Sequence, residues 1–531
     1  MNLLITNANI YTVNPLQPRA TALAIANDRI VAVGSDAEID AVRLPGAQRL
    51  DMHGAFILPG MIDAHLHLLW SGLAMQRVDI YEAPSSRDVV ERVCARAAQT
   101  PRGQWIQGHG WTQALWGGRF PTAAELDEAT REHPVALSAK SGHALWVNSL
   151  AMQMAGITAQ TADPEGGRFV RDEAGRPSGV LLENAMALLN AHIPEPTAEQ
   201  EEAATVLAMA AMNRVGLTGA HCMDGEGGIA SFRTYGRLQE QGRLTLRIVK
   251  QLPVEELDAV LKAGIRSGFG GPWLRIGGIK LFADGALGPR TAAMLAPYEG
   301  EPDNRGISTF EREALFEAVM RCNANGLAAV VHAIGDRANH DVLDAFEVSA
   351  RRAPPARRPL RNRIEHAQIL HPDDIARFSR LDVIASVQPI HATQDMFMAD
   401  AHWGSRSANA YAIRALRDAG ARLAFGSDSP VESFNPIVGM HAAVTRRRAD
   451  GTPGPAGWYP QQRVTIEDAI RGYTIGAAWG GGMEREVGTL ETGKLADLVV
   501  LSRDLTATPP DELLSVHVER VMVNGAWIKS L

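Results

Sequence analysis

The stretch Asp-Ala-His-Leu-His (63–67) ends an apolar run that begins at Phe56, and later parts of the chain repeat this layout. In each part, polar residues stand at or near the end of a short apolar run, which a turn and a helical stretch follow. The later strings are Ile-Lys-Leu-Phe-Ala-Asp-Gly (279–285), the histidine strings Val-Val-His-Ala (330–333) and Ile-Glu-His-Ala (364–367), and Phe-Gly-Ser-Asp-Ser (425–429). In chain order they supply two histidines, a lysine, two histidines and an aspartate, a set rich in residue types that bind metal ions.

Apolar runs of strand length alternate with helical stretches through the middle of the chain. The eight strand candidates are Phe56–His67, Leu217–Met223, Leu244–Gln251, Leu274–Phe282, Leu327–His332, Arg363–Ile369, Val383–Pro389 and Arg422–Asp428. Eight strand–helix units predict an α/β fold of the (β/α)8 TIM-barrel type. A doubly wound open sheet is the alternative, but it normally carries a Gly-rich phosphate loop, and none follows the first strand.

Both ends of the chain are rich in short β-like segments. Residues 1–55 and 480–531 are therefore predicted to form one composite β-sandwich, with a hairpin signal at Asn524-Gly525. The barrel is assigned to residues 56–479. Its first two strand candidates are much farther apart than a crossover requires, so residues 72–212 are predicted to be an inserted subdomain over the C-terminal mouth of the barrel.

Composition narrows the classes of partner. The 531 residues include 52 Lys and Arg against 60 Asp and Glu, a net charge of −8, and the basic residues form no stripe. Nucleic acid is therefore not an expected partner, since phosphate binding requires clustered Lys and Arg. The N-terminus does not resemble a signal peptide, and no apolar run is long enough to span a membrane. Three cysteines without a CxxC pair favour a reducing compartment.

Four histidines are candidate metal ligands. Residues two apart in a strand share a face, so His65 and His67 can both point into the barrel and hold one cation. His332 and His366 each end an apolar strand candidate. Taken singly, each of the four could be an ordinary core or loop histidine. Together at strand ends they are hard to explain by packing, because a buried imidazole needs a polar partner and a metal supplies one.

Asp428 and Lys280 complete the set. A carboxylate at a barrel mouth is costly to bury unless it is paired or binds a metal, although Asp428 could also cap a helix before Ser429-Pro430. Lys280 stands between apolar residues, and burial would lower the pKa of its amine and make it nucleophilic. The amine could then add CO₂ and become a carbamate that bridges two cations. An ordinary salt bridge to Asp284 or Asp428 is the alternative.

The chain resembles the amidohydrolase superfamily and, within it, the YtcJ-like group that includes N-substituted formamide deformylase. The resemblance rests on Leu-Pro-Gly-Met-Ile-Asp-Ala-His-Leu-His (58–67), Gly-His-Gly-Trp (108–111), Ser-Gly-His-Ala-Leu-Trp-Val-Asn-Ser (141–149), Lys-Leu-Phe-Ala-Asp-Gly-Ala-Leu-Gly (280–288), Arg-Ile-Glu-His-Ala (363–367), Gly-Ser-Asp-Ser-Pro (426–430) and Gly-Lys-Leu-Ala-Asp-Leu-Val-Val-Leu (493–501). These stretches span nearly the whole chain, but they say little about the substrate.

The resemblance implies a metal pair, most often zinc, with Mn²⁺ or Fe²⁺ also compatible with nitrogen and oxygen ligands. His65, His67 and Asp428 would hold the first ion, His332 and His366 the second, and a carboxylated Lys280 would bridge them. Some relatives use one metal, so the number of ions, one or two, stays open. A cytoplasmic homodimer is the default expectation from the superfamily.

The implied activity is hydrolysis of a C–N bond in a small amide or formamide. Zinc lowers the pKa of a bound water to about 7, and the resulting hydroxide would attack the carbonyl carbon. Asp428 is the expected catalytic residue, which accepts a proton and passes it to the leaving amine.

Two other functions are alternatives. A mononuclear deaminase would carry Glu three residues after the strand-five histidine, where this chain has Gly335 and then Asp336. A non-catalytic amidohydrolase-like protein would be expected to lose ligands, yet all six are present.

Substrate contacts are predicted at four positions: His143, Trp111, Arg290 and Asp284. Arg290 could bind a substrate carboxylate or carbonyl, with a structural salt bridge as the alternative. Trp111 and His143 lie in the predicted insertion, with His109 and Trp146, and could line an aromatic pocket or form the core of the insertion. His221 and His391, at strand ends, are possible pocket residues. Glu365 alternates in direction with His366 and is predicted to point out of the barrel.

Overall fold

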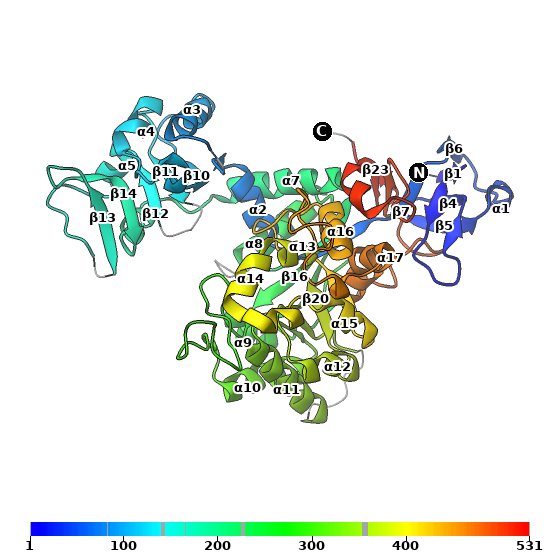
Figure 1. Cartoon of the computed structure of the whole chain (residues 1–531). Coiled ribbons are helices and arrows are strands. Elements are labelled where there is room, and N and C mark those ends of the chain that lie inside the picture. The colour runs from blue at the N-terminus through cyan, green and yellow to red at the C-terminus, as the bar shows by residue number, and fades with distance from the viewer. Residues whose placement is uncertain are drawn as a thin grey trace. The chain divides into compact units, whose positions relative to one another are not determined.

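The computed structural model describes residues 2–81, 83–139, 144–164, 166–224, 229–352 and 359–529. The chain forms two compact units, of which the first comprises Met1–Ser71 with Thr205–Leu531 and the second comprises Gly72–Ala204. The first unit contains an eight-stranded parallel sheet and two smaller sheets, and the second contains a six-stranded mixed sheet. Figure 1 labels their elements in chain order.

The eight-stranded sheet of the first unit is the predicted barrel. Its strands follow one another in chain order, and all neighbouring pairs are parallel. They are β8 (Met61–Leu66), β15 (Leu217–Cys222), β16 (Arg247–Pro253), β17 (Leu274–Phe282), β18 (Ala328–Ala333), β19 (Arg363–His366), β20 (Ile384–Val387) and β21 (Arg422–Phe425). Each of the eight candidate runs overlaps one of these strands, with β16 and β18 extending slightly past the predicted ends, so the predicted fold class is confirmed.

The first candidate run, Phe56–His67, is two strands rather than one. Phe56–Pro59 forms β7, which pairs with β22 (Leu498–Leu501) in a different sheet, and only Met61–Leu66 belongs to the barrel. Gly60 separates them. A Cβ atom at this position would lie 2.3 Å from Thr218 Oγ1, so the close approach to β15 requires glycine.

The barrel seam between β8 and β21 is joined by hydrogen bonds beyond the regular ladders. The Asp428 N–H donates to the His65 carbonyl oxygen at 2.7 Å, and the His67 N–H donates to the Ser429 carbonyl oxygen at 2.8 Å. The buried Asp63 carboxylate accepts from the N–H groups of His65 (2.9 Å) and Ser427 (3.1 Å). The seam therefore places the first and last predicted ligand strings side by side.

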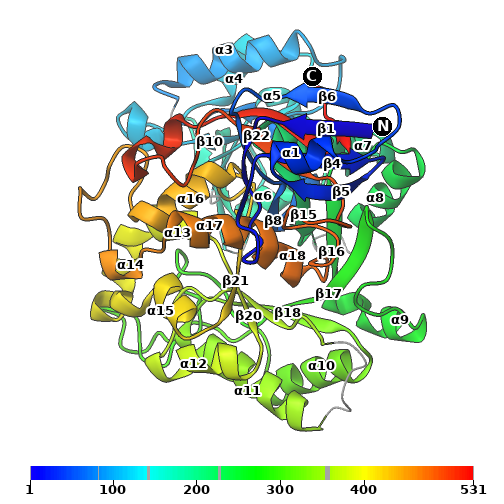
Figure 2. The same ribbon diagram turned by 90° about the vertical axis from the view of Figure 1, so that its right-hand side faces the viewer.

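Helices follow the barrel strands. Figure 2 shows α10 (Arg312–Ala324), α11 (Asp336–Arg352) and α12 (Pro372–Arg380) lying outside β17, β18 and β20. In α11, Ala338, Val342, Ala345 and Phe346 are buried at the three- and four-residue spacing of one helix face. Other helices of this unit include α8 (Ala230–Glu240), α9 (Leu257–Lys262), α13 (Pro389–Gln394), α14 (Met396–Trp403), α15 (Ile413–Asp418) and α16 (Pro436–Thr445).

Strands from both ends of the chain form the two smaller sheets of the first unit. The four-stranded sheet has the order β5 (Arg29–Gly34), β4 (Ala22–Ala26), β1 (Asn2–Thr6), β6 (Gln48–Asp51), and the six-stranded sheet has the order β24 (Ala526–Trp527), β23 (Val518–Val523), β22, β7, β2 (Asn9–Tyr11), β3 (Arg19–Ala20). One apolar cluster containing Leu3, Ile25, Ile57, Val500 and Met522 joins them. Asn524 and Gly525 both have positive φ, as a tight hairpin turn requires.

The second unit has its own sheet and core. Its strands follow the order β13 (Gly167–Arg171), β14 (Pro177–Glu183), β12 (Ala144–Val147), β11 (Val135–Ala139), β10 (Ile106–Trp111), β9 (Val78–Asp79), with α3 (Ser86–Ala97) and α4 (Ala123–Ala129) packed on them. Trp111 and Trp146 are fully buried in its core, and Trp116 packs against them. A location of this unit over the barrel mouth stays a prediction.

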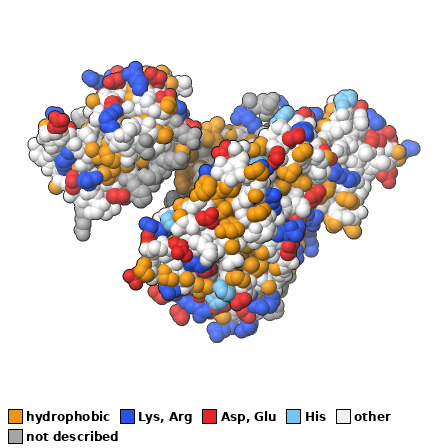
Figure 3. Space-filling view, viewed as in Figure 1, with side chains coloured by type: hydrophobic (Ala, Val, Ile, Leu, Met, Phe, Trp, Pro, Cys, Tyr) orange, Lys and Arg blue, Asp and Glu red, His pale blue; other side chains and the backbone are white. Residues whose placement is uncertain are grey.

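On the face shown in Figure 3, Lys and Arg side chains are interspersed with Asp and Glu. Among the described residues, no helix combines the length and apolar character needed to cross a membrane.

Candidate metal centre

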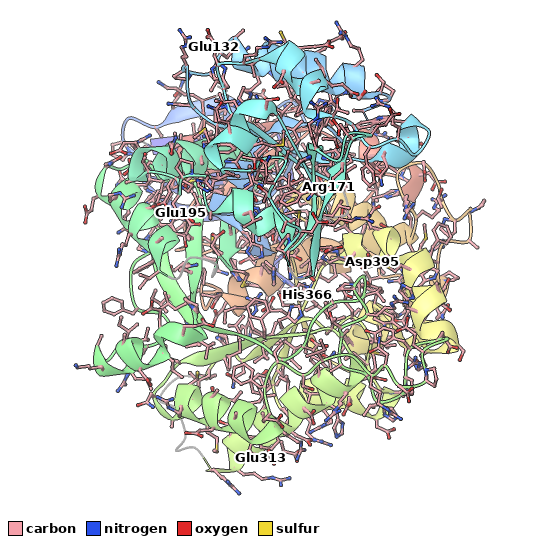
Figure 4. All side chains as sticks on the ribbon, turned by 90° about the vertical axis from the view of Figure 1, so that its left-hand side faces the viewer. Glu132, Arg171, Glu195, Glu313, His366 and Asp395 are labelled. Carbon is pink, nitrogen blue, oxygen red and sulfur yellow. The ribbon has the colours of Figure 1, made fainter. Side chains whose placement is uncertain are left out.

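The six residues that the sequence analysis named as metal ligands line one cavity in the first unit. The cavity has a volume of about 590 Å³ and lies at the C-terminal ends of the barrel strands. His65 and His67 come from β8 and the residue after it, Lys280 from β17, His332 from β18, and His366 from β19 (Figure 4 labels His366), while Asp428 follows β21. The strand-end pattern therefore brought these side chains together.

Two groups of side chains converge on the Asp428 carboxylate. The Nε2 atoms of His65 and His67 lie 3.2 Å and 3.3 Å from Asp428 Oδ1. On the other side, His391 Nε2 lies 3.4 Å from Asp428 Oδ2, and His366 completes this second group. In each group the potential ligand atoms lie within 4.8 Å of one another. The His332 ring centroid lies 4.7 Å from that of His366, so His332 borders the second group.

Backbone geometry at two of these positions is unusual. His366 and Asp428 have φ values of 73° and 62°, in the left-handed region that side chains other than glycine rarely adopt. Such conformations cluster where a fold holds functional side chains in place. Here His366 is the last residue of β19 and Asp428 lies shortly after the end of β21, and both side chains line the cavity.

Hydrogen bonds decide which ring nitrogen of each histidine faces the centre. His65 Nδ1 lies 2.5 Å from Glu365 Oε2, and His366 Nδ1 lies 2.8 Å from Gln388 Oε1. Both acceptors require a protonated Nδ1, which leaves Nε2 free to bind a cation. In His332 the roles are reversed, because Nε2 donates to the Gly285 carbonyl oxygen at 2.9 Å and leaves Nδ1 free.

Electrostatics favour neutral His332 and His366 and an ionised Asp428, whereas the Asp428 carboxylate raises the pKa of His391 to about 9 against the effect of burial. Burial lowers the pKa of His332 to about 3 and the pKa of His366 well below its usual value. Burial alone would raise the pKa of Asp428, but His65, His391 and His67 hold it well below its usual value. Burial also lowers the pKa of Lys280 to about 8. Neutral imidazole and ionised carboxylate are the forms that bind metal ions.

The residues present fit a divalent cation. The centre offers imidazole nitrogens and a carboxylate with both oxygens surrounded by histidines, and no cysteine lines the cavity among the described residues. Such nitrogen and oxygen donors suit Zn²⁺, Mn²⁺ or Fe²⁺. The histidine pair on β8 with Asp428 could hold one ion, and the remaining histidines with Lys280 border the position for a second.

The predicted outward direction of Glu365 is wrong. Glu365 is fully buried and faces the barrel interior, where it contacts His65 and Arg363. Strand alternation fails here because β19 ends at His366, where a positive φ departs from regular strand backbone, and His366 itself lines the cavity. Arg363, two residues earlier on the same strand face, was the signal in the sequence that an ion pair lies inside the barrel.

Three of the predicted substrate contacts lie away from the cavity lining. The buried Asp284 carboxylate accepts hydrogen bonds from the N–H groups of Ile334, Gly335 and Ala293. It therefore links the loops that follow β17 and β18. Arg290 forms an ion pair with Glu301. Trp111 belongs to the core of the second unit, where its Nε1–H donates to the Leu137 carbonyl oxygen. His143 lies outside the described residues.

Loop residues supply most of the remaining cavity wall. His391, considered as a possible pocket residue, does line the cavity, whereas His221 is buried beneath it against Arg363. The lining residues that sequence reasoning missed include Trp70, Glu255, Phe282, Leu287, Gln368, Asp395 (labelled in Figure 4), Met398, Val431 and Glu432. Only their proximity to strand ends could have suggested them.

Comparison with known proteins agrees with this geometry. A model of the amidohydrolase family matches residues 48–528. The chain is 30% identical to a putative amidohydrolase, YtcJ, of Bacillus subtilis (strain 168), with 97% of each chain covered. It is 31% identical to an N-substituted formamide deformylase of Arthrobacter pascens, over 99% of this chain and 97% of that one.

A solved structure gives the same result for the fold. The crystal structure of an uncharacterized metal-dependent hydrolase from Pyrococcus furiosus superposes with a TM-score of 0.79 at 30% identity, covering 95% of this chain and 100% of the other. The chain therefore belongs to the amidohydrolase family of metal-dependent hydrolases, and its relatives place it with the YtcJ-like proteins.

Proposed function

We propose that this amidohydrolase cleaves the C–N bond of a small amide, with formamides among the candidate substrates. The observation that carries the proposal is the convergence of His65, His67 and His391 on the Asp428 carboxylate inside one cavity. The likeness to an N-substituted formamide deformylase supports a C–N bond as the target. A divalent cation held there would supply Lewis acidity, which activates water and polarises an amide carbonyl.

The side chains of this chain have separate tasks in such a reaction. Asp428 is ionised and faces the cavity, so it can accept a proton from the attacking water and return it to the leaving nitrogen. His391 contacts the outer oxygen of Asp428 and can hold that carboxylate in place. Trp70, Phe282 and Leu287 give the cavity apolar wall segments that an apolar substituent of the substrate can contact.

We also propose that Lys280 is carboxylated. Its amine is buried beside the histidines, and a pKa of about 8 leaves a usable fraction unprotonated near neutrality. The ammonium first loses one proton, and the free amine then forms an N–C bond to CO₂ and loses a second proton, which leaves a carbamate anion. Two zinc ions, a cytoplasmic location and a homodimer complete the proposal, with a small molecule rather than nucleic acid as the partner.

The cavity lining favours substrates without a carboxylate. Glu255, Asp395 and Glu432 line it in addition to Asp428, and Lys280 is the sole Lys or Arg among the described lining residues. An anionic group on the substrate would therefore lie near carboxylates with no arginine to bind it. Neutral or amine-bearing amides with an apolar substituent match this surface better.

The test is turnover of a panel of model amides by the zinc-loaded protein. The panel contains neutral N-substituted formamides, the matching acetamides and N-acyl amino acids, with release of amine measured directly. We expect turnover of the neutral amides, and none by a His65→Ala variant. Ammonia release from purines or pyrimidines alone would favour the deaminase alternative. Stoichiometric zinc without turnover of any compound would favour a non-catalytic relative.

A further inference from the structure

An ion pair lies directly beneath the metal centre. Arg363 and Glu365 are both fully buried and share the inner face of β19. The Arg363 guanidinium donates to both carboxylate oxygens of Glu365, through Nε to Oε1 and through Nη2 to Oε2 at 3.1 Å. The same Oε2 atom lies 2.5 Å from His65 Nδ1. Arg363, Glu365 and His65 therefore form a continuous line that ends at the Asp428 carboxylate.

The guanidinium is itself fixed by three further strands. Arg363 Nη2 donates to the Ala64 carbonyl oxygen (2.5 Å) on β8 and to Ser386 Oγ (2.6 Å) on β20. Arg363 Nη1 lies 2.8 Å from His221 Nδ1 on β15. A guanidinium with this many partners has one available orientation, and the Glu365 carboxylate is held with it.

Stability alone does not account for this arrangement. A buried ion pair loses so much hydration that apolar side chains of similar volume often stabilise a core as well or better. The position of Glu365 Oε2 on a metal-facing histidine gives the pair a different role. Carboxylates that accept from the second ring nitrogen of a histidine fix its tautomer and increase its affinity for metal.

We propose that Glu365, held in place by Arg363, is a positioning residue for the metal centre. It keeps His65 protonated at Nδ1, aims His65 Nε2 toward Asp428 Oδ1, and makes that nitrogen a stronger ligand. The inference rests on the metal-dependent function proposed above. It assigns the buried ion pair to metal affinity and not only to the stability of the barrel.

The chain contains a matched ion pair for comparison. Arg247 and Asp497 are buried to nearly the same degree, with Arg247 Nε 2.5 Å from Asp497 Oδ2 and Nη2 2.8 Å from Oδ1. Arg247 is the first residue of β16, away from the strand ends that carry the centre. Among the described residues, the Asp497 carboxylate accepts from Arg247 and from the N–H group of Asn524, and neither is a histidine. Asp497→Asn therefore breaks a comparable ion pair without touching a metal ligand.

The experiment measures Zn²⁺ affinity of the full chain after removal of metal, by competition with a chromophoric chelator. Wild type, Glu365→Gln and Asp497→Asn are compared, and the thermal stability of each metal-free protein is recorded. We expect Glu365→Gln to weaken binding of one Zn²⁺ by about 10- to 100-fold. Asp497→Asn should lower stability and keep the wild-type affinity. The visible spectrum of the Co²⁺-loaded protein should change in Glu365→Gln alone.

Each other outcome has a distinct meaning. Wild-type affinity in Glu365→Gln overturns the inference and leaves the proposed function intact. Absence of Zn²⁺ binding by the wild type overturns both. If Glu365→Gln fails to fold, Glu365→Asp decides the matter, because it keeps the charge and shortens the reach toward His65. Wild-type Zn²⁺ affinity in Glu365→Asp then counts against a positioning role.

Discussion

The Asp428 N–H donates to the carbonyl oxygen of His65 across 2.7 Å, so the first and last ligands in the sequence are joined through their backbones. Their side chains meet above this bond, with His65 Nε2 3.2 Å from Asp428 Oδ1. A metal site built on the closing seam of a barrel is held by the same hydrogen bonds that close the sheet. Binding of an ion there should therefore also stabilise the seam.

Asp428→Asn should abolish most of the activity and remove metal from the first group. The amide keeps the shape of the side chain but cannot accept a proton, and it is a weaker ligand. We expect kcat/KM to fall by about 10²- to 10⁴-fold, the usual contribution of a general acid–base residue. Metal content by elemental analysis and steady-state kinetics test this. Kinetics within a few-fold of wild type would exclude Asp428 from both roles.

Lys280→Ala should lower both metal content and activity. Without the amine no carbamate can form, and the second ion loses its link to the first group. Mass spectrometry of the intact wild type under native conditions should show the added mass of one CO₂, absent from the variant. Reloading of metal-free wild type should be faster with bicarbonate present. Full metal content and activity in Lys280→Ala would contradict the bridging role.

Phe282→Ala should weaken binding of apolar amides without a large effect on chemistry. The Phe282 ring lies 5.2 Å from the His332 ring and is partly exposed on the cavity wall. Loss of one apolar contact surface weakens the free energy of substrate binding by about 1–3 kcal/mol, so KM should rise about 10-fold while kcat changes little. Phe269→Ala, at an exposed phenylalanine outside the cavity lining, is the control. Equal kinetics for both variants would remove Phe282 from the substrate site.

Trp111→Ala should destabilise the second unit and leave metal content unchanged. Trp111 is fully buried, and its ring stacks on Trp116 with centroids 6.0 Å apart. Truncation of such a side chain typically costs about 3–5 kcal/mol. Denaturant unfolding, zinc analysis and limited proteolysis of residues 72–204 test this. A variant with wild-type stability but lost turnover would restore the predicted role of Trp111 as a substrate contact.

The barrel and the grouping of the metal-ligand candidates in one place could both be predicted from the sequence. Strand periodicity locates an interior face, and parallel strands bring their C-terminal ends to one side, so His332, His366 and Asp428 could be placed together without coordinates. The direction of Glu365 could not be predicted, because the alternation was counted from His366, whose positive φ departs from regular strand backbone. Local patterns show where a strand runs but not the residue at which its alternation stops.

The other residues of the cavity wall could not be predicted from the sequence, for a related reason. Asp395 and Glu432 come from segments after β20 and β21. Tertiary contacts determine the path of these segments, for example the hydrogen bond that the Tyr411 hydroxyl donates to Asp395 at 2.6 Å. The split of Phe56–His67 at Gly60 also depends on a partner, Thr218, that is distant in sequence. Asp284 was predicted to contact substrate. Its actual role, as an acceptor for three backbone N–H groups, produces no recognisable sequence pattern.

Strand β7 pairs with β22 near the end of the chain, and one glycine separates it from β8, which carries His65. The strand that precedes the barrel is thus anchored to a strand that is synthesised after all eight barrel strands. During synthesis, β7 has no access to this partner until the segment that forms the barrel has been made. Removal of β22 should therefore impair a metal centre whose first two histidines lie far earlier in the chain.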